Sequence, residues 1–224
     1  MGRPELLGTS LFDLTDKIAI VTSAGRGVGR MVALALAAAG TDIVASARTA
    51  PELEALCSEV RALGRCAEAV VTGVTVEASG EHLISTTVDR LGGIHILVNN
   101  AGINIRKPAL ALSLAEFQLV LDTNLTGSFL CAWAAGRHMV AQRRGKVIDI
   151  SSILGRVALA SQTAYASSKG ALQQLTKVLA LEWAQANVQV NAIGPAYLET
   201  ELTRPLFEDP ERNRFITERT PMGR

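Results

Sequence analysis

The chain has 224 residues, of which 48% are hydrophobic, and a formal net charge of +1 at pH 7. This length and hydrophobic content suffice for one sizeable core, and the small net charge gives no reason to expect nucleic acid or an anionic membrane as a partner. The longest uncharged apolar stretch, residues 31–39, is far shorter than the roughly 20 residues of a membrane span. The N-terminal segment has no apolar core of signal-peptide length. We therefore expect a cytoplasmic protein that acts on a small molecule.

The first predicted element is a buried strand at residues 17–22 (KIAIVT), followed by a glycine-rich turn and an alanine-rich helix that begins near residue 31. Gly25, Gly27 and Gly29 lie in the turn. Glycines between a strand and a helix let backbone amides approach a pyrophosphate, which the helix N-terminus also favours electrostatically. This segment predicts dinucleotide binding.

Strands and helices alternate along the rest of the chain. Apolar runs predict strands at residues 42–47, 66–71, 95–100, 146–151 and 188–194, and helical patterns cover 51–63, 78–91, 113–142 and 162–185. Such alternation predicts an α/β fold, a Rossmann-type doubly wound parallel sheet with helices on both faces. No linker, repeat or charge run divides the chain, so residues 1–224 are expected to form a single domain. The ligand crevice should lie at the carboxyl ends of the strands, where Thr22, Asn99, Ser151 and Pro195 fall.

A possible catalytic group follows the fifth strand. Tyr165 and Lys169 are four residues apart in a predicted helix, and so share one face of it. The Lys169 ammonium is expected to favour the ionised phenol and to lower the pKa of Tyr165 from its ordinary value of about 10. Ser152 lies 13 residues before Tyr165, and its hydroxyl can hold a carbonyl or alcohol oxygen. This trio predicts proton exchange with an oxygen atom.

Together these motifs resemble the short-chain dehydrogenase/reductase family over residues 11–224. The family's Thr-Gly-x-x-x-Gly-x-Gly turn is matched by Thr22, Ser23, Gly25, Gly27 and Gly29. Its Asn-Asn-Ala-Gly motif is matched by residues 99–102, its helical asparagine by Asn124, and its Ser, Tyr and Lys by Ser152, Tyr165 and Lys169. Residues 190–195 (VNAIGP) also fit.

The resemblance implies roles for these residues. Tyr165 is the general acid/base, Lys169 tunes it and binds the nicotinamide ribose, Ser152 orients the substrate oxygen, and Asn124 holds a water that relays protons. Alternatively, Asn124 is an interior helix residue bonded to a neighbouring backbone. The residues expected to bind the cofactor are Thr22, Ser23, Gly25, Arg26, Gly27, Val28, Gly29, Arg48, Val74, Asn100, Ala101, Gly102, Tyr165, Lys169, Pro195 and Thr200.

The charge at the end of the second strand bears on the choice of cofactor. An acidic residue there would bind the adenosine ribose and repel a 2′-phosphate, but this sequence has Ala47 and then Arg48. Arg26, in the glycine turn, can approach the same phosphate from the other side. We therefore expect NADP(H) to be favoured over NAD(H). The alternative is that both arginines are solvated surface residues.

Residues 102–127 look most like the gluconate 5-dehydrogenase branch of the family. That resemblance implies a sugar acid as substrate, with Arg106, Ser152 and Tyr165 as substrate-binding residues. Arg156 is a second candidate for the carboxylate, although either arginine can instead be a loop residue or a subunit contact. A 3-oxoacyl-carrier-protein reductase is the alternative enzyme. A non-catalytic dinucleotide-binding sensor or structural subunit is the alternative of another class.

The sequence departs from the family pattern at several places. Ser23 replaces a glycine, which costs on the order of 1 kcal/mol if the position has a positive φ. Gly73 stands where an aspartate usually binds adenine, and Ala196 where glycine is usual. The family continues for roughly 30 residues beyond Arg224, so the last strand is expected to be absent and its neighbour at 188–194 to be left as an uncovered edge. Family members form dimers or tetramers, and residues 195–220 predict a mobile lid or a surface loop.

Cysteines and histidines give no sign of a metal site. Cys57, Cys66 and Cys131 are odd in number and lack CxxC spacing, which favours reduced thiols. The three histidines, His82, His95 and His138, are scattered along the chain. We therefore assign no metal.

Overall fold

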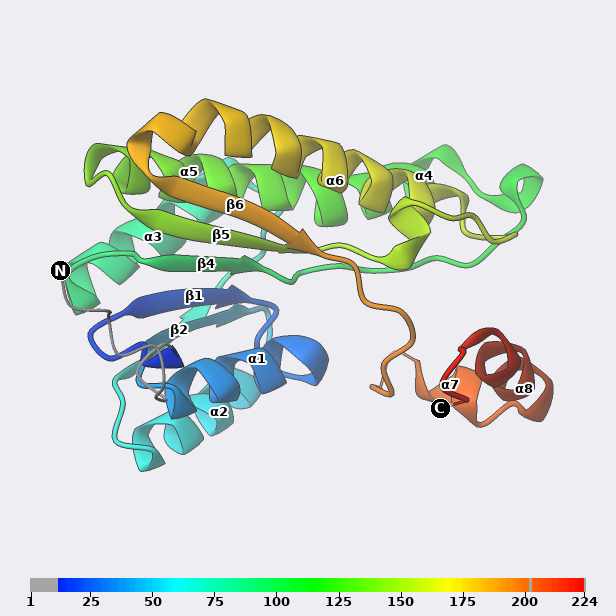
Figure 1. The fold of residues 1–224 in the computed structure, drawn as a ribbon, viewed down its shortest axis with the longest axis horizontal. Coiled ribbons are helices and arrows are strands. Elements are labelled where there is room, and N and C mark those ends of the chain that lie inside the picture. The colour runs from blue at the N-terminus through cyan, green and yellow to red at the C-terminus, as the bar shows by residue number, and fades with distance from the viewer. Residues whose placement is uncertain (1–11, 202, 224) are drawn as a thin grey trace, which may run out of the picture.

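The computed structural model describes residues 12–201 and 203–223. The expectations that involve residues 1–11, including the absence of a signal peptide, lie outside the described residues. Six parallel strands form one sheet in the order β3-β2-β1-β4-β5-β6 (Figure 1). The strands are β1 (Ile18–Thr22), β2 (Asp42–Ala47), β3 (Ala67–Val71), β4 (Ile96–Asn99), β5 (Gly145–Ile150) and β6 (Val188–Ile193). This order confirms the predicted doubly wound sheet, and its reversal between β1 and β4 marks the expected crevice.

Helices cover both faces of the sheet, as the alternating pattern predicted (Figure 1). On one face lie α1 (Gly27–Ala38) and α2 (Ala50–Ala62). On the other lie α3 (Glu77–Leu91), α5 (Gly127–Ala141) and α6 (Thr163–Trp183), with α4 (Leu114–Leu121) beyond them. Short 3₁₀ turns occupy Ala109–Ala111, Ile153–Gly155 and Ala184–Ala186. Two further helices, α7 (Arg204–Phe207) and α8 (Pro210–Arg219), follow β6 and stand apart from the sheet.

The two faces of the sheet carry two apolar clusters. One joins Ile20 and Leu97 of the sheet to Leu83 of α3 and Met139 of α5. The other packs strand residues such as Val21 against α1 and α2. All five residues of β1 are buried, because both of its faces are covered, and this accounts for a continuous apolar run instead of an alternating one. The paired clusters hold the central strands, and therefore their carboxyl ends, in fixed positions.

The helix predicted over residues 113–142 is one continuous helical path with an irregular turn inside it. It begins at Ser113, whose side chain forms a capping box with Glu116. Between α4 and α5, Asp122–Thr126 forms a π-helical turn in which the backbone stays helical. Such wide turns are rare and often occur at functional sites. This turn contains Asn124, one of the predicted catalytic residues.

β6 is an edge strand, paired with β5 alone among the described residues. Its last residues are exposed, and Ile193 is 53% accessible. The expectation of an uncovered edge strand is therefore confirmed for this part of the chain. The segment after β6 is not a simple loop, because it contains α7 and α8; its mobility stays a prediction.

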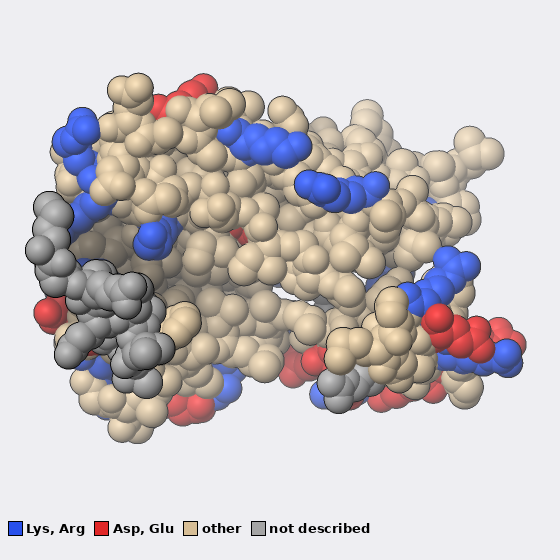
Figure 2. Space-filling model, viewed as in Figure 1, with Lys and Arg blue, Asp and Glu red and all other residues tan. Residues whose placement is uncertain are grey.

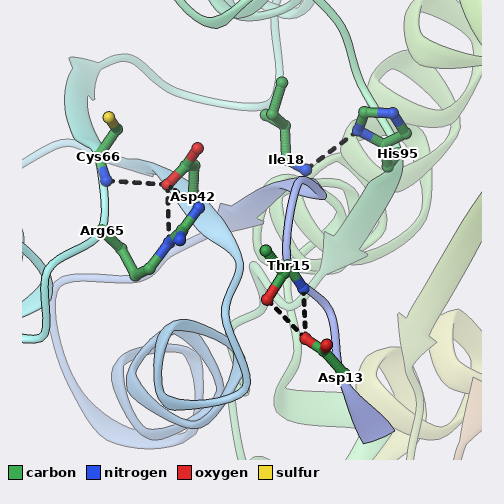
Figure 3. Close-up of polar contacts among 7 residues, drawn as sticks. All are labelled: Asp13, Thr15, Ile18, Asp42, Arg65, Cys66 and His95. Atoms are coloured by element: carbon green, nitrogen blue, oxygen red, sulfur yellow. Dashed lines mark hydrogen bonds and ion pairs between the residues drawn. The ribbon is translucent and has the colours of Figure 1, made fainter. Parts of the chain in front are cut away.

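Polar contacts tie the amino ends of the strands together (Figure 3). The Ile18 amide donates to Nδ1 of His95 at 3.1 Å, which joins the starts of β1 and β4. Asp42, at the start of β2, accepts hydrogen bonds from Arg65 Nε at 3.0 Å and from the Cys66 amide at 2.9 Å. His95 is thus a hydrogen-bond acceptor in the scaffold, and burial together with nearby cations lowers its pKa. These contacts lie at the amino ends of the strands, whereas the predicted crevice lies at their carboxyl ends.

The surface shows no strong separation of charge on the face in view. Positive and negative side chains are scattered, mostly toward its rim, and much of the remainder is uncharged (Figure 2). Among the helices of the described residues, none is both long and apolar enough to cross a membrane. Within the same residues, no three His, Cys, Asp or Glu side chains come together as a metal site.

Candidate active site

The glycine turn joins β1 to α1, as the motif predicted. Ser23 has φ of +52° and Gly27 has φ of +55°, so the serine does occupy a left-handed position that favours glycine. At Gly29, a Cβ atom would lie 2.4 Å from both Asn100 Nδ2 and the Ser23 carbonyl. Only glycine fits there, because α1 packs directly on the strand ends. At Gly27 the nearest atom to an added Cβ is in Thr200, 4.0 Å away, which leaves open space over the turn.

Thr22 and Asn100 fasten the ends of β1 and β4 to each other. The Thr22 hydroxyl accepts hydrogen bonds from the amides of Asn100 (2.9 Å) and Ala101 (3.0 Å). In return, Asn100 Nδ2 donates to the carbonyls of Thr22 at 3.0 Å and Ser23 at 3.2 Å. Both side chains therefore shape the switch point of the sheet. In the structure, the hydroxyl of Thr22 is therefore hydrogen-bonded to the protein backbone.

Asn124 is fully buried in the π turn and clamps the loop that follows β4. Its Oδ1 accepts from the Ile103 amide at 2.8 Å, and its Nδ2 donates to the Ile103 carbonyl at 3.0 Å. Nδ2 also lies 3.0 Å from the hydroxyl of Ser168, which donates to the Tyr165 carbonyl at 2.7 Å. The alternative interpretation, a bond to a neighbouring backbone, is thus what the structure shows directly. The predicted water relay stays a prediction.

Ser152 follows β5 and begins a 3₁₀ turn, where its Oγ accepts from the Leu154 amide at 3.2 Å. Gln173 of α6 holds this turn in place, since its Nε2 donates to Ser151 Oγ and to the Ser152 carbonyl, each at 3.1 Å. The expected position of Ser152 at the carboxyl end of β5 is confirmed. Gln173 was not predicted, because an amide on a helix gives no motif in sequence.

Tyr165 and Lys169 lie on the α6 face that covers the end of β5. Lys169 Nζ is 5.8 Å from the centre of the Tyr165 ring and donates to the Ile150 carbonyl at 2.6 Å. Only 4% of Lys169 is exposed. Burial lowers its pKa to about 8, and the nearby Asp149 carboxylate opposes that change. The two groups are therefore neighbours, as their spacing predicted, but the ammonium is bonded to the strand.

The expectation that Lys169 lowers the pKa of Tyr165 is wrong for the protein on its own. Burial raises the pKa of Tyr165, and the Ser152 side chain and the positive charge of Arg106 act in the opposite direction. The physical reason is that the partly buried ring loses contact with water, which disfavours the phenolate. The sequence could not show how strongly the surrounding side chains desolvate the phenol.

One cleft runs over the ends of β2 and β3. It has a volume of about 380 Å³, and its lining includes Ser23, Arg48, Gly73, Val74, Ala101 and Gly102. Arg48 therefore lies where the sequence placed it. Arg26 does not line this cleft, because its guanidinium lies 3.7 Å from Glu201 and is largely exposed. Of the two arginines predicted to bind the 2′-phosphate, only Arg48 lines the cleft.

A second cleft lies beside it, over the ends of β4 and β5. The predicted residues that line it are Val28, Asn100, Gly102, Ser152, Tyr165, Lys169, Pro195 and Thr200, and Ala196 lies there too. Gly102 contacts both clefts, so the two lie side by side. A Cβ at Gly102 would be 3.5 Å from Lys169 Nζ. Lys169 therefore lies next to the point where the two clefts meet.

A third hollow, of about 530 Å³, is bounded by α8 and the turn before α6. Arg106 lines it together with Gln162, Tyr197 and Phe215. Arg156, the second candidate for a carboxylate, lines another cavity, between β6 and α6, which Ser152 also lines, so its role stays a prediction. Gln162 was missed in sequence: it is 7% exposed, and its Oε1 has no hydrogen-bond partner among the described residues.

These features fit a dinucleotide. The glycine turn leaves open space over a helix N-terminus, which a Cβ atom at Gly27 would enter. Two adjoining clefts continue from it in opposite directions, one past Arg48 and the other to Tyr165 and Lys169. The side-chain set offers an acidic proton donor, a cation and a hydroxyl at the second cleft. This combination suits hydride exchange at a carbon whose oxygen contacts Tyr165.

Comparisons with known proteins agree with this geometry. Residues 17–211 match the family model for short chain dehydrogenase. The chain is 35% identical to gluconate 5-dehydrogenase of Gluconobacter oxydans over 224 residues, which is 100% of this chain and 86% of that protein. It is 38% identical to 3-oxoacyl-[acyl-carrier-protein] reductase of Synechocystis over 88% of this chain and 80% of that one. A crystal structure of gluconate 5-dehydrogenase from Burkholderia cenocepacia, in complex with NADP and tartrate, superposes with a TM-score of 0.93 at 37% identity, covering 96% of this chain and 85% of that one.

Proposed function

Because this chain belongs to the short-chain dehydrogenase/reductase family, and is an NAD(P)-dependent oxidoreductase acting on CH–OH groups, we propose that it interconverts a sugar acid and its keto form, of the gluconate and 5-keto-gluconate type. The observation that carries the proposal is the position of Arg106. It lines the hollow beneath α8, and its charge acts on the phenol of Tyr165. A substrate whose reacting oxygen contacts Tyr165 can therefore place a carboxylate within reach of this cation.

The chain's own residues hold the substrate and move the proton. In the reducing direction, the Tyr165 hydroxyl donates its proton to the carbonyl oxygen while a C–H bond forms at the carbonyl carbon. Ser152 donates a hydrogen bond to the same oxygen, and the Lys169 ammonium stabilises the phenolate that remains. The bound nicotinamide supplies the hydride in this direction and accepts it in the other. Oxidation of the alcohol reverses each step, with Tyr165 as the base.

We propose NADP(H) as the preferred cofactor. Arg48 lines the cleft at the end of β2, and Ala47 precedes it, so a 2′-phosphate meets a cation and no carboxylate from that strand end. Arg48→Ala is expected to weaken NADPH binding roughly tenfold or more, as loss of a charge-assisted hydrogen bond does, and to leave NADH binding nearly unchanged. Arg26→Ala is the matched control and should have a smaller effect, because Arg26 contacts Glu201.

Steady-state kinetics with purified protein test the substrate. NADPH oxidation is measured with 5-keto-gluconate, and NADP reduction with D-gluconate. Arg106→Ala should raise KM for the acid by roughly tenfold to a hundredfold. Arg156→Ala should have a smaller effect, because Arg106 is the arginine whose charge acts on Tyr165. Tyr165→Phe should abolish turnover and leave NADPH binding nearly intact. Substantial turnover by that variant would contradict the role of Tyr165.

The Synechocystis relative supports a second candidate, a 3-oxoacyl-carrier-protein reductase. Acetoacetyl thioesters are therefore included in the same assay. Turnover of the thioester at a higher kcat/KM than 5-keto-gluconate, unaffected by Arg106→Ala, would replace the sugar-acid proposal. Tight NADPH binding without turnover of either class would favour the non-catalytic dinucleotide-binding sensor.

We also propose that the enzyme is a cytoplasmic homo-oligomer built from a single-domain subunit. Apolar side chains are exposed along α4 and α5, where Leu114 is 80%, Leu119 is 51% and Phe129 is 40% accessible. Such a face favours association. The three free cysteines fit a reducing compartment. Light scattering after size-exclusion chromatography measures the mass of the particle, and a monomer at micromolar concentration would exclude the oligomer.

A further inference from the structure

A buried acid lies behind the catalytic residues and has no part in the chemistry described above. Asp149, in β5, is 1% exposed. A carboxylate in such a place is costly unless hydrogen bonds or an opposite charge compensate for it. Asn99 Nδ2 donates to Oδ1 of Asp149 at 2.9 Å, and Thr176 Oγ1 lies 2.7 Å from Oδ2. Both carboxylate oxygens are thus held, one by β4 and the other by α6.

The same helix face that carries Thr176 also carries Lys169. These residues are seven apart, which is two turns of a helix. Lys169 Nζ donates to the carbonyl of Ile150, the residue after Asp149, and Ser151 Oγ donates to the carbonyl of Lys169 at 3.1 Å. α6 is therefore fastened to β5 at the carboxylate, through Thr176, and at the two residues that follow it, through Lys169.

The contacts of Asp149 also extend to the π turn. Asn99 Nδ2 donates to the Ser128 carbonyl at 3.1 Å as well as to Asp149. Ser128 Oγ in turn donates to the Asn124 carbonyl at 3.0 Å. A hydrogen-bonded chain therefore leads from the acid to Asn124, so one buried group is in contact with the supports of two predicted catalytic residues.

The groups around the acid leave Lys169 as its charged partner. β4 presents Asn99, the start of α5 presents Ser128, and α6 presents Thr176 and Lys169; β6 pairs with this part of β5 through its backbone. Lys169 is the charged group that acts on Asp149, and Asp149 is the one that acts on Lys169. Tyr165 faces Lys169 from the same helix.

We propose that Asp149 is a positioning residue, whose buried carboxylate joins β4, β5 and α6 behind the active site and keeps Lys169 positively charged in its working pH range. The inference rests on the proposed role of Lys169 in the same site. The signs agree with the local electrostatics: burial raises the pKa of Asp149 and lowers that of Lys169, and each charge opposes the change in the other. Removing the carboxylate should make Lys169 lose its proton at lower pH.

Two substitutions separate the charge from the hydrogen bonds. In Asp149→Asn the amide oxygen still accepts from Asn99, and the new NH₂ group can donate to Thr176 Oγ1, because that hydroxyl can donate instead to the Leu172 carbonyl at 2.8 Å. The charge alone is lost. In Thr176→Val the carboxylate remains but one hydrogen bond to it is removed. This second variant is the matched control for packing and stability.

A lysine titration measures the effect without substrate or cofactor. The chain has five lysines, so carbon-13 labelling at Cε gives a simple NMR spectrum. The signal of Lys169 is the one that disappears in the Lys169→Met variant. The wild-type midpoint should lie at about 8, and that of Asp149→Asn at least about one pH unit lower, with Thr176→Val unchanged. Equal midpoints in Asp149→Asn and wild type would overturn the proposal. If Asp149→Asn does not fold, Lys169→Met tests the same coupling. The Asp149 carboxyl should then titrate at higher pH than in wild type, because it has lost its cationic neighbour. An unchanged midpoint of that carboxyl would also overturn the proposal.

The pH dependence of kcat/KM gives the functional readout. Asp149→Asn should lose activity mainly on the alkaline side, because the alkaline limb of its pH profile should shift to lower pH, as in the lysine titration. Thr176→Val should keep the wild-type profile and melt at a lower temperature. A loss by the same factor at every pH would mean that Asp149 is only structural. Because the lysine titration uses no substrate, inactivity of the wild type toward sugar acids would refute the proposed substrate and leave this test intact.

Discussion

Replacing Asn124 by alanine is expected to destabilise the protein and loosen the loop that carries Arg106. The side chain makes two hydrogen bonds to the main chain of Ile103, of 2.8 and 3.0 Å, and a third with Ser168. Asn124 is completely buried, so water cannot simply replace these bonds. Alanine leaves an amide and a carbonyl of Ile103 without their partners.

The magnitude follows from those contacts. Each unsatisfied buried group costs about 1–3 kcal/mol, so the loss of both partners should cost about 2–6 kcal/mol of unfolding free energy. For a chain of this size that corresponds to a fall in Tm of roughly 4–24 °C. Because Ile103 lies three residues before Arg106, KM for an acidic substrate should rise more than the Kd for NADPH.

Thermal denaturation followed by circular dichroism measures the loss of stability, and the kinetic assay measures the rise in KM that is expected from the loosened loop. Ser168→Ala is the control, because it removes one contact of Asn124 and leaves both bonds to Ile103. It should cost about 1 kcal/mol. If Asn124→Ala melts no lower than Ser168→Ala, the clamp on Ile103 contributes little and the reasoning is refuted.

Two further predictions concern the turn and the thiols. Gly29→Ala should abolish NADPH binding and lower Tm, because the new Cβ would lie 2.4 Å from two neighbouring atoms. Gly93→Ala, where an added Cβ meets nothing within 4 Å, should change neither; equal behaviour of the two would contradict the close approach at the turn. With a thiol reagent at pH 8, only the exposed Cys66 should react quickly. Burial raises the pKa of the Cys57 thiol to about 11 and that of the Cys131 thiol to about 12. Rapid reaction of all three thiols in the native protein would show that the core opens readily.

Sequence reasoning identified the elements and the motifs because both are local. The period of apolar residues predicted the six strands and the helices that cover the sheet, but not α7 and α8. Short motifs predicted the glycine turn and the helical positions of Asn124 and Tyr165. The π turn was not predicted, since one wide turn hardly alters the apolar period of the helix around it. Asp149 was also missed. In sequence it is one polar residue inside an apolar strand, and only its partners on β4 and α6 give it a role.

Where the predictions depended on surroundings, they were less accurate. The pKa of Tyr165 is raised although a lysine lies one helical turn away, because burial of the ring outweighs a cation that is bonded to the Ile150 carbonyl. Arg26 contacts Glu201 and not the cleft beside Arg48. Both errors concern a long side chain, Lys169 or Arg26, whose direction depends on residues far away in the chain.

The sequence by itself determined the parallel α/β fold, the order of its elements, and the family to which the enzyme belongs, because backbone conformation and apolar periodicity are properties of short segments. Only the tertiary structure decided which polar groups meet. Burial, charge and hydrogen bonding at Tyr165, Lys169 and Asp149 arise from β4, β5 and α6, which are separated by many residues and meet only when the sheet has formed. Electrostatic effects depend on distance and on exclusion of water, and neither quantity exists before the chain is folded.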